Sequence, residues 1–225
     1  MEDDLATLSD KAYRALRRDI VSGNLKPGER LRIAKLINDY DIGASPLREA
    51  LSKLSSEFLV LVEGQRGFSV APISVEELRD VSQIRQDLEA EAVRRAIANG
   101  GDQWEAAIVA AFYNLSKADR RRQEDNVAFA AEWEDRNREF HEALVAACDS
   151  ETIKRLRRLL YYQHERYRRI SLKNPDPLRD LDAEHRAIME ATLARDTERA
   201  ITLSREHIDR TTRAVLDVIA PLEVA

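Results

Sequence analysis

The sequence predicts a mostly α-helical protein: an N-terminal winged helix-turn-helix, α-helical with a small β-hairpin wing, followed by a C-terminal all-α bundle of six helices. The 225 residues include only seven glycines and six prolines, and 34% are charged, as expected of long helices with few loops. Apolar residues recur at spacings of three and four, which is typical of helices that bury one face. A hairpin signal near residue 65 interrupts this pattern. We therefore expect two domains, residues 1–72 and residues 73–225.

Two short helices are expected before the hairpin. The first spans about 31–41, where Leu31 begins a short apolar face. The second is predicted to begin with Ser45 as N-cap and Pro46 at the first helical position, where the missing N–H of proline costs nothing. Apolar residues then follow at spacings of four, three and four, on the side expected to be buried: Leu47, Leu51, Leu54 and Phe58.

The hairpin follows this second helix directly. Residues 59–62 (LVLV) and 67–70 (GFSV) flank a turn at residues 63–66, which is a hairpin signal. Two helices followed by such a hairpin form a winged helix-turn-helix, whose second helix enters the major groove of double-stranded DNA. The candidate DNA-contacting residues, at the start of the first helix, on the second helix and at the wing tip, are Arg32, Ser45, Arg48, Gln65, Arg66 and Gly67.

Charge and composition restrict the kinds of partner that we expect and the cellular compartment in which the protein works. The net charge is −5, but residues 5–72 are slightly basic, which suits binding at selected DNA sites rather than to any nucleic acid. No stretch approaches about eighteen consecutive apolar residues, and the N-terminus is acidic, so we expect neither a membrane span nor a signal peptide. The single cysteine, Cys148, cannot form an internal disulfide. These features predict a cytoplasmic protein that makes no membrane contact.

The second domain is expected to be helical throughout. Ser74 and Glu77 form an S-x-x-E capping box at its start. Glycine, proline and polar breaks then divide the chain into six helices, whose apolar faces would form the core of a bundle. The expected helices span about 74–98, 102–120, 125–148, 150–171, 177–195 and 197–219.

Histidines interrupt the apolar faces of three of these helices. His141, His185 and His207 stand where leucine would be expected, and Asn137 lies one turn before His141 on the same face. Buried imidazoles need partners, and several in one bundle suit a divalent metal ion. Spacing alone does not decide between a shared metal site and hydrogen-bonded core histidines. For a metal, three nitrogen ligands favour zinc, with nickel or manganese compatible. His164 lies on an arginine-rich segment and is not counted among the candidate metal ligands.

Arginines interrupt the same kind of face. Arg85 lies on the apolar side of the first bundle helix, and Arg166 with Tyr167 lies on that of the fourth. A buried guanidinium needs a carboxylate or phosphate partner. Either Glu89 or Glu139 supplies that partner internally, or the carboxylate of a small effector does so beside the metal. Arg85, Arg166 and Tyr167 are therefore the candidate effector-binding residues.

The sequence contains none of the common catalytic motifs: no G-x-S-x-G, P-loop, G-x-G-x-x-G or H-E-x-x-H. The alternative of a helical metalloenzyme with an accessory DNA-binding head would need a general base beside the metal, and no glutamate has a diagnostic spacing. A DNA-binding architectural protein without a ligand would leave the inward-facing histidines and arginines unexplained. The arginine runs 120–122 and 157–158 are expected on solvated helix surface.

Both halves of the chain resemble a known family. Residues 25–31 (LKPGERL) resemble the L-x-P-G-x-x-L entry of the winged helix of GntR-family bacterial transcription regulators, and residues 42–51 (IGASPLREAL) resemble its V-S-R-T-P-V-R-E-A-L recognition helix. The remainder resembles the FCD ligand-binding domain of the FadR subfamily. The motifs that resemble its metal ligands are Phe140-His141-x-x-Leu144, Glu184-His185-x-x-Ile188 and Glu206-His207-Ile208.

This resemblance implies a homodimeric, metabolite-responsive repressor of a carboxylate or amino-acid catabolic operon, released from its operator by a small carboxylate effector bound near the metal. Ala44 replaces the arginine of the family's S-R-T-P wording, so one DNA contact is missing. Asn137 stands where the family often has aspartate, so its oxygen would ligate without charge.

Overall fold

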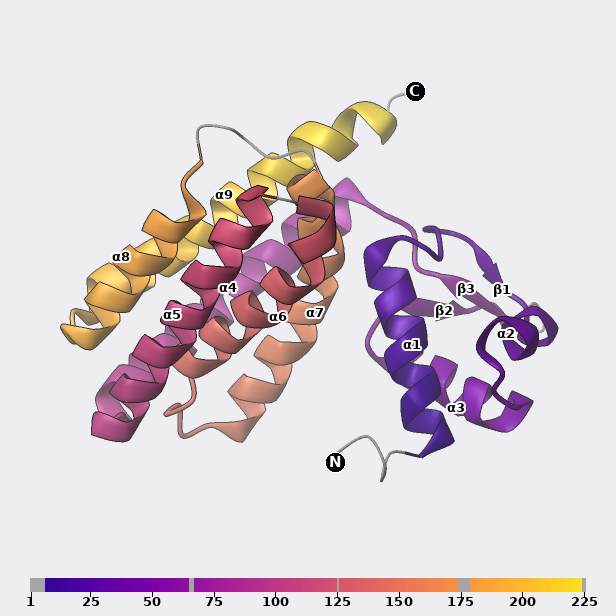
Figure 1. Cartoon of the computed structure of the whole chain (residues 1–225), viewed down its shortest axis with the longest axis horizontal. Helices are drawn as coiled ribbons and strands as arrows, with labels where there is room; N and C mark the ends of the chain where they lie inside the picture. The colour runs from indigo at the N-terminus through magenta and orange to yellow at the C-terminus, as the bar shows by residue number, and fades with distance from the viewer. Residues whose placement is uncertain (1–6, 65–66, 125, 174–178, 224–225) are drawn as a thin grey trace. The chain divides into compact units, whose positions relative to one another are not determined.

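The computed structural model describes residues 7–64, 67–124, 126–173 and 179–223 (Figure 1). The chain forms two compact units, which are described separately. The first comprises Met1–Val81, Leu159–Asn174 and Val215–Ala225, and the second comprises Ser82–Arg158 and Pro175–Ala214.

The N-terminal part of the first unit is a winged helix-turn-helix. Its elements in chain order are α1 (Leu8–Ser22), β1 (Arg30–Leu31), α2 (Ile33–Tyr40), α3 (Ala44–Ser56), β2 (Val60–Val62) and β3 (Phe68–Val70). The three strands form an antiparallel sheet in the order β1-β3-β2. The predicted hairpin is therefore confirmed, with Val60 opposite Val70. The sequence pattern indicated neither α1 nor the two-residue strand β1.

The predicted start of α3 was wrong by two residues. Gly43, not Ser45, is the N-cap, and no side chain caps the helix. Gly43 takes the extended conformation that an N-cap needs, so the helix begins before the serine. The first helical hydrogen bond runs from the Leu47 N–H to the Gly43 carbonyl at 3.3 Å, so Pro46 still occupies a position whose N–H would have no helical partner.

Leucines from several elements form the core under the sheet. Leu47, Leu51 and Leu54 of α3 are all fully buried, as predicted. Leu31 is buried too, but from β1 rather than from a helix. Phe58 was predicted to be buried and is 56% exposed, because it follows the end of α3 with a left-handed φ of 60° that turns the chain.

All six predicted bundle helices are present, with ends shifted by a few residues. They are α4 (Val75–Asn99), α5 (Asp102–Glu124), α6 (Asn126–Leu144), α7 (Glu151–Lys173), α8 (Leu181–Leu193) and α9 (Thr197–Glu223). Within the second unit, α5 packs against both α6 and α8 (Figure 1). The Ser74 hydroxyl accepts a hydrogen bond from the Glu77 N–H at 3.2 Å, which confirms half of the capping box. The Ser74 N–H donates to the Tyr167 hydroxyl instead of to Glu77.

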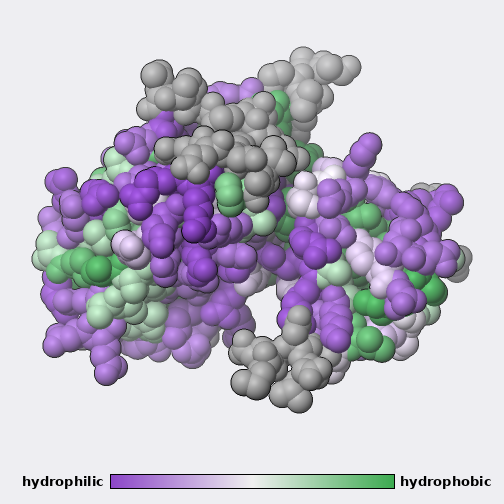
Figure 2. Space-filling model, in the orientation of Figure 1, coloured by the Kyte–Doolittle hydropathy of each residue, from purple (hydrophilic) through white to green (hydrophobic). Residues whose placement is uncertain are grey.

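Hydrophilic side chains predominate on the face of the molecule seen in Figure 2. Among the described helices, none combines the length and the apolar character that crossing a membrane requires.

Candidate metal centre and DNA-binding face

Helix α3 presents one face to solvent. Arg48 and Ser45 are exposed, while Leu47 and Leu51 on the opposite side are buried in the core. The helix is thus held by its leucines and leaves its polar side open to a partner. Arg32, the N-cap of α2, is also exposed.

The wing tip is described only in part. Gly67 has a φ of 90°, in the left-handed region that favours glycine, and it begins the return of the hairpin into β3. Gln65 and Arg66, which were also predicted to contact DNA, lie outside the described residues.

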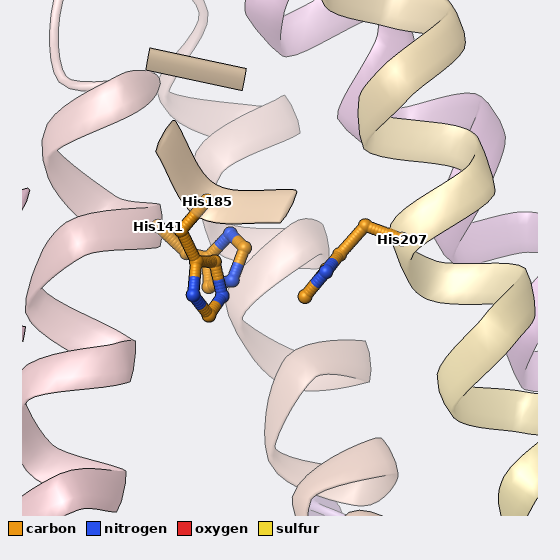
Figure 3. A group of neighbouring side chains, drawn as sticks. All are labelled: His141, His185 and His207. Atoms are coloured by element: carbon orange, nitrogen blue, oxygen red, sulfur yellow. The ribbon is translucent and has the colours of Figure 1, made fainter. Parts of the chain in front are cut away.

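The three predicted histidines come together inside the second unit. His141 of α6, His185 of α8 and His207 of α9 are all buried, and their ring centroids lie 4.7 to 5.4 Å apart. One ligating atom from each lies within 4.8 Å of the others. Figure 3 shows the three side chains pointing toward one another from their separate helices. Nitrogen donors in this arrangement suit a divalent metal ion.

The surrounding helices explain this convergence. A short loop separates the end of α8 at Leu193 from the start of α9 at Thr197. The rings of Phe140 and His185 meet edge to face, with centroids 5.3 Å apart, so an apolar side chain borders the group. Asn137 is buried one turn before His141 on α6 and remains the predicted fourth ligand.

Glu184 holds the ring of His207. Its Oε2 lies 2.7 Å from His207 Nδ1, which leaves Nε2 as the ligating atom. Arg179 donates two hydrogen bonds to the same carboxylate, at 3.0 and 2.8 Å, and Arg210 donates a third at 3.2 Å. Burial raises the pKa of Glu184, but the hydrogen bonds from His207 and Arg179 outweigh it and hold the pKa well below its usual range. A carboxylate behind a histidine in this way fixes the ring for metal binding.

Two of the imidazoles are held in the neutral form that binds metal. Burial, together with electrostatic interactions with His207 and His185 and the positive charges of Arg85 and Arg157, lowers the pKa of His141 well below its usual value. Burial also lowers the pKa of His207, although its hydrogen bond with Glu184 opposes the shift.

Arg85 belongs to this centre. Its side chain is only 2% exposed, and its charge contributes to the lowered pKa of both His141 and His207. Of the two carboxylates considered as internal partners of a buried arginine, Glu89 binds Arg157 and Glu139 binds Arg136.

The structure does not bring Arg166 and Tyr167 to the histidines. Both lie in the first unit, where the Arg166 guanidinium donates to the carbonyls of Ala71 and Pro72, each at 2.9 Å. The Tyr167 hydroxyl and Arg166 also bind the carboxylate of Glu77. These two side chains therefore hold the segment that connects β3 to α4.

Arg157 was placed wrongly on solvated surface. Its side chain is fully buried and binds Glu89, Glu142 and the carbonyl of His141. The apolar residue before it, Leu156, is 44% exposed. Most of the buried residues of α7 are polar or charged, so hydrophobic spacing could not reveal that Arg157 is one of them.

Two families of known proteins match the chain. Residues 8–70 match the bacterial regulatory proteins of the gntR family, and residues 80–210 match the FCD domain. The chain belongs to the GntR family. As a GntR regulator with an FCD domain, it binds DNA through its winged helix and responds to a small molecule through its helical domain.

Curated relatives support this assignment. The HTH-type transcriptional regulator BphR of Paraburkholderia xenovorans is 42% identical over 203 residues, covering 90% of this chain and 83% of BphR. The HTH-type transcriptional repressor GlaR of Escherichia coli is 41% identical over 200 residues, covering 87% of this chain and 90% of GlaR. These relatives are transcription regulators. The expectation of a non-enzymatic protein is therefore confirmed, and the alternative of a metalloenzyme is rejected.

Solved structures of GntR regulators share the fold. McbR/YncC of E. coli has a TM-score of 0.78 and 21% identity, covering 95% of this chain and 99% of that structure. A GntR regulator from Rhodococcus sp. RHA1 has a TM-score of 0.72 and 21% identity, covering 93% and 98%. The predicted winged helix-turn-helix with a helical C-terminal domain is thereby confirmed.

Proposed function

We propose that this GntR regulator is a cytoplasmic, homodimeric repressor of a carboxylate or amino-acid catabolic operon. It binds its operator through α3 and the wing of residues 1–72, and it is released when a small carboxylate effector binds beside a metal ion in residues 73–225. The observation that carries the proposal is the group of three buried histidines on three helices, with ligating atoms within 4.8 Å of one another.

The donor set fits a divalent metal ion. His141, His185 and His207 supply three nitrogens, and Asn137, one turn from His141, supplies a carbonyl oxygen. Three nitrogen ligands favour zinc, and nickel or manganese is compatible with the same set. When bound, the metal supplies a positive centre with coordination positions open to an anionic oxygen.

The charge around the site favours an anionic effector. Arg85 is buried near His141 and His207, and a buried guanidinium is best matched by a carboxylate. We therefore propose Arg85 as the effector-binding arginine. Arg166 and Tyr167, which we also expected to bind the effector, hold residues 71–77, and this supports a role in transmitting the response to the DNA-binding domain.

Metal analysis tests the first half of the proposal. Wild-type protein should carry about one metal ion per chain, and the double variant His141→Ala/His185→Ala should carry none. The fourth histidine offers a matched control, because His164 is buried but lies outside the group. The variant His164→Gln should keep its metal, and stoichiometric metal in the double variant would overturn the site.

A shift assay tests the second half. Metal-loaded protein is bound to DNA from its own upstream region and titrated with a panel of small mono- and dicarboxylates. At least one should weaken binding in wild-type protein and have a much smaller effect on Arg85→Met. If no carboxylate changes operator affinity, the effector proposal fails while the metal proposal stands.

A further inference from the structure

The C-terminal end of α6 lies next to a proposed metal ligand. The helix ends at Leu144, and the last four carbonyl groups of any α-helix have no partner within the helix. Here the Val145 N–H bonds the Glu142 carbonyl at 3.3 Å, and the Ala146 N–H bonds the Ala143 carbonyl at 3.2 Å. The carbonyl of His141, in this last turn of α6, also has a hydrogen-bond partner outside the helix.

Arg157 is that partner. Its Nη2 donates to the His141 carbonyl at 2.7 Å, from α7. The same guanidinium donates from Nε and Nη2 to the two oxygens of Glu89 on α4, at 2.8 and 3.1 Å, and from Nη1 to Glu142 at 3.1 Å. One fully buried side chain therefore ties together α4, α6 and α7.

We infer that Arg157 is a positioning residue for the metal centre, and this inference rests on the proposed metal site. Arg157 caps the end of α6 at the residue whose ring ligates the metal. A positive group near a helix C-terminus interacts favourably with the helix dipole, and the bond to a charged donor is stronger than one to a neutral donor. Because the capped carbonyl and the ligating imidazole belong to one residue, fixing the carbonyl fixes where the ring begins.

This role requires arginine rather than another cation. The planar fork of a guanidinium can bind both oxygens of Glu89 and still reach a carbonyl and a second carboxylate. A lysine ammonium presents only three donors at one point. Metal–ligand distances tolerate deviations of only about 0.2 Å. A less firmly held end of α6 should therefore lower the metal affinity.

The next residue offers a matched control. The side chain of Arg158 is 52% exposed and lies 3.5 Å from Glu142. An exposed ion pair of this kind contributes little. Arg157→Met and Arg158→Met remove the same group from adjacent positions of α7, one inside the network and one at its edge.

Hydrogen exchange on the full-length, chelated protein tests whether Arg157 fixes the end of α6. Amides of residues 141–146 should exchange about tenfold faster or more in Arg157→Met, because a buried carbonyl loses its donor. The Arg158→Met variant should exchange like wild-type protein. Unchanged exchange in Arg157→Met, or an equal increase in both variants, overturns the role of Arg157 as a cap.

Metal affinity tests whether that cap positions His141. Chelator competition with Zn²⁺ should show binding about 10- to 100-fold weaker in Arg157→Met, partial recovery in Arg157→Lys and no change in Arg158→Met. The Co²⁺ absorption spectrum of Arg157→Met should also differ from wild type, because the ligand geometry has changed.

The outcomes separate this inference from the proposed function. Wild-type affinity in a folded Arg157→Met variant overturns the positioning role and leaves the metal site intact. Absence of metal binding in wild-type protein overturns both the site and the positioning role, while the exchange experiment still decides the cap. If Arg157→Met does not fold, Glu89→Gln takes its place, with a smaller loss of affinity expected and none overturning the role.

Discussion

His141 and His207 are buried imidazoles whose pKa values lie below the ordinary value, chiefly because of burial. In the unfolded chain these groups take up protons near pH 6.5, whereas in the folded protein they stay neutral to lower pH. The unfolded state therefore binds more protons below that pH, and stability falls as the pH falls. Urea unfolding of chelated protein should show lower stability at pH 5.5 than at pH 7.5.

A variant separates this effect from general acid sensitivity. In His141→Gln one of the two groups is gone, so the loss of stability between pH 7.5 and pH 5.5 should be smaller than in wild-type protein. The low pKa of Glu184 affects stability only in a more acidic range, near and below the usual pKa of a carboxyl group. An identical pH dependence in both proteins would contradict the assignment to His141.

Arg48 is expected to be a main DNA contact because it is exposed on α3, opposite the buried leucines. Arg48→Ala should weaken operator binding by about 1–3 kcal/mol if the side chain reaches a base edge. If the side chain binds phosphate instead, the slope of log affinity against log salt concentration should decrease in magnitude by about one. Stability should change by less than about 0.5 kcal/mol. Arg18→Ala, which removes an exposed arginine of α1, is the control, and unchanged affinity in Arg48→Ala would refute the contact.

Single residues were predictable where one polar side chain stood in an apolar pattern. His141, His185 and His207 were found in this way. Arg157 was not, because its partner Glu89 lies 68 residues away and only the packing of helices joins them. The hydrogen bond between Glu184 and His207 was likewise not predictable, because it joins two different helices.

At the level of elements, hydrophobic spacing located all six helices of the bundle but missed α1, and it failed where burial is polar or pairing is remote. Strand β1 is two residues long and is defined by its pairing with β3, about forty residues later, so no local pattern marks it. The buried face of α7 carries arginine and tyrosine side chains satisfied by partners on other elements.

The connection between β3 and α4 is expected to depend on α7. Arg166→Met leaves the carbonyls of Ala71 and Pro72 without their donor, at a cost of about 1–3 kcal/mol. Hydrogen exchange of residues 71–78 should therefore become faster. Arg169→Met, which removes a more exposed arginine paired within α7, should leave this segment protected, and equal protection in both variants would contradict the role of Arg166.

For the whole molecule we predict a symmetric dimer. One winged helix buries too little surface to select a single operator, whereas two half-sites combine their binding energies. The helical domain is the expected place for the isologous interface. Light scattering at micromolar concentration should give twice the 25.7 kDa of the chain, and a monomer both with and without operator would exclude this.

Gly100 lies in a loop that contributes no metal ligand, yet a substitution there should affect the metal centre. A β-carbon there would lie 1.9 Å from the ring of Trp104, whose Nε1 donates to the Ala143 carbonyl at the end of α6. Gly100→Ala should push the indole away and lower Zn²⁺ affinity in chelator competition, whereas Gly101→Ala, where the added carbon has open space, should not. Equal affinity in both variants would show that the indole adapts. A genetic selection for regulators that no longer respond to their signal should therefore recover substitutions at Gly100 alongside those at the histidines, although this position contributes no side chain at all.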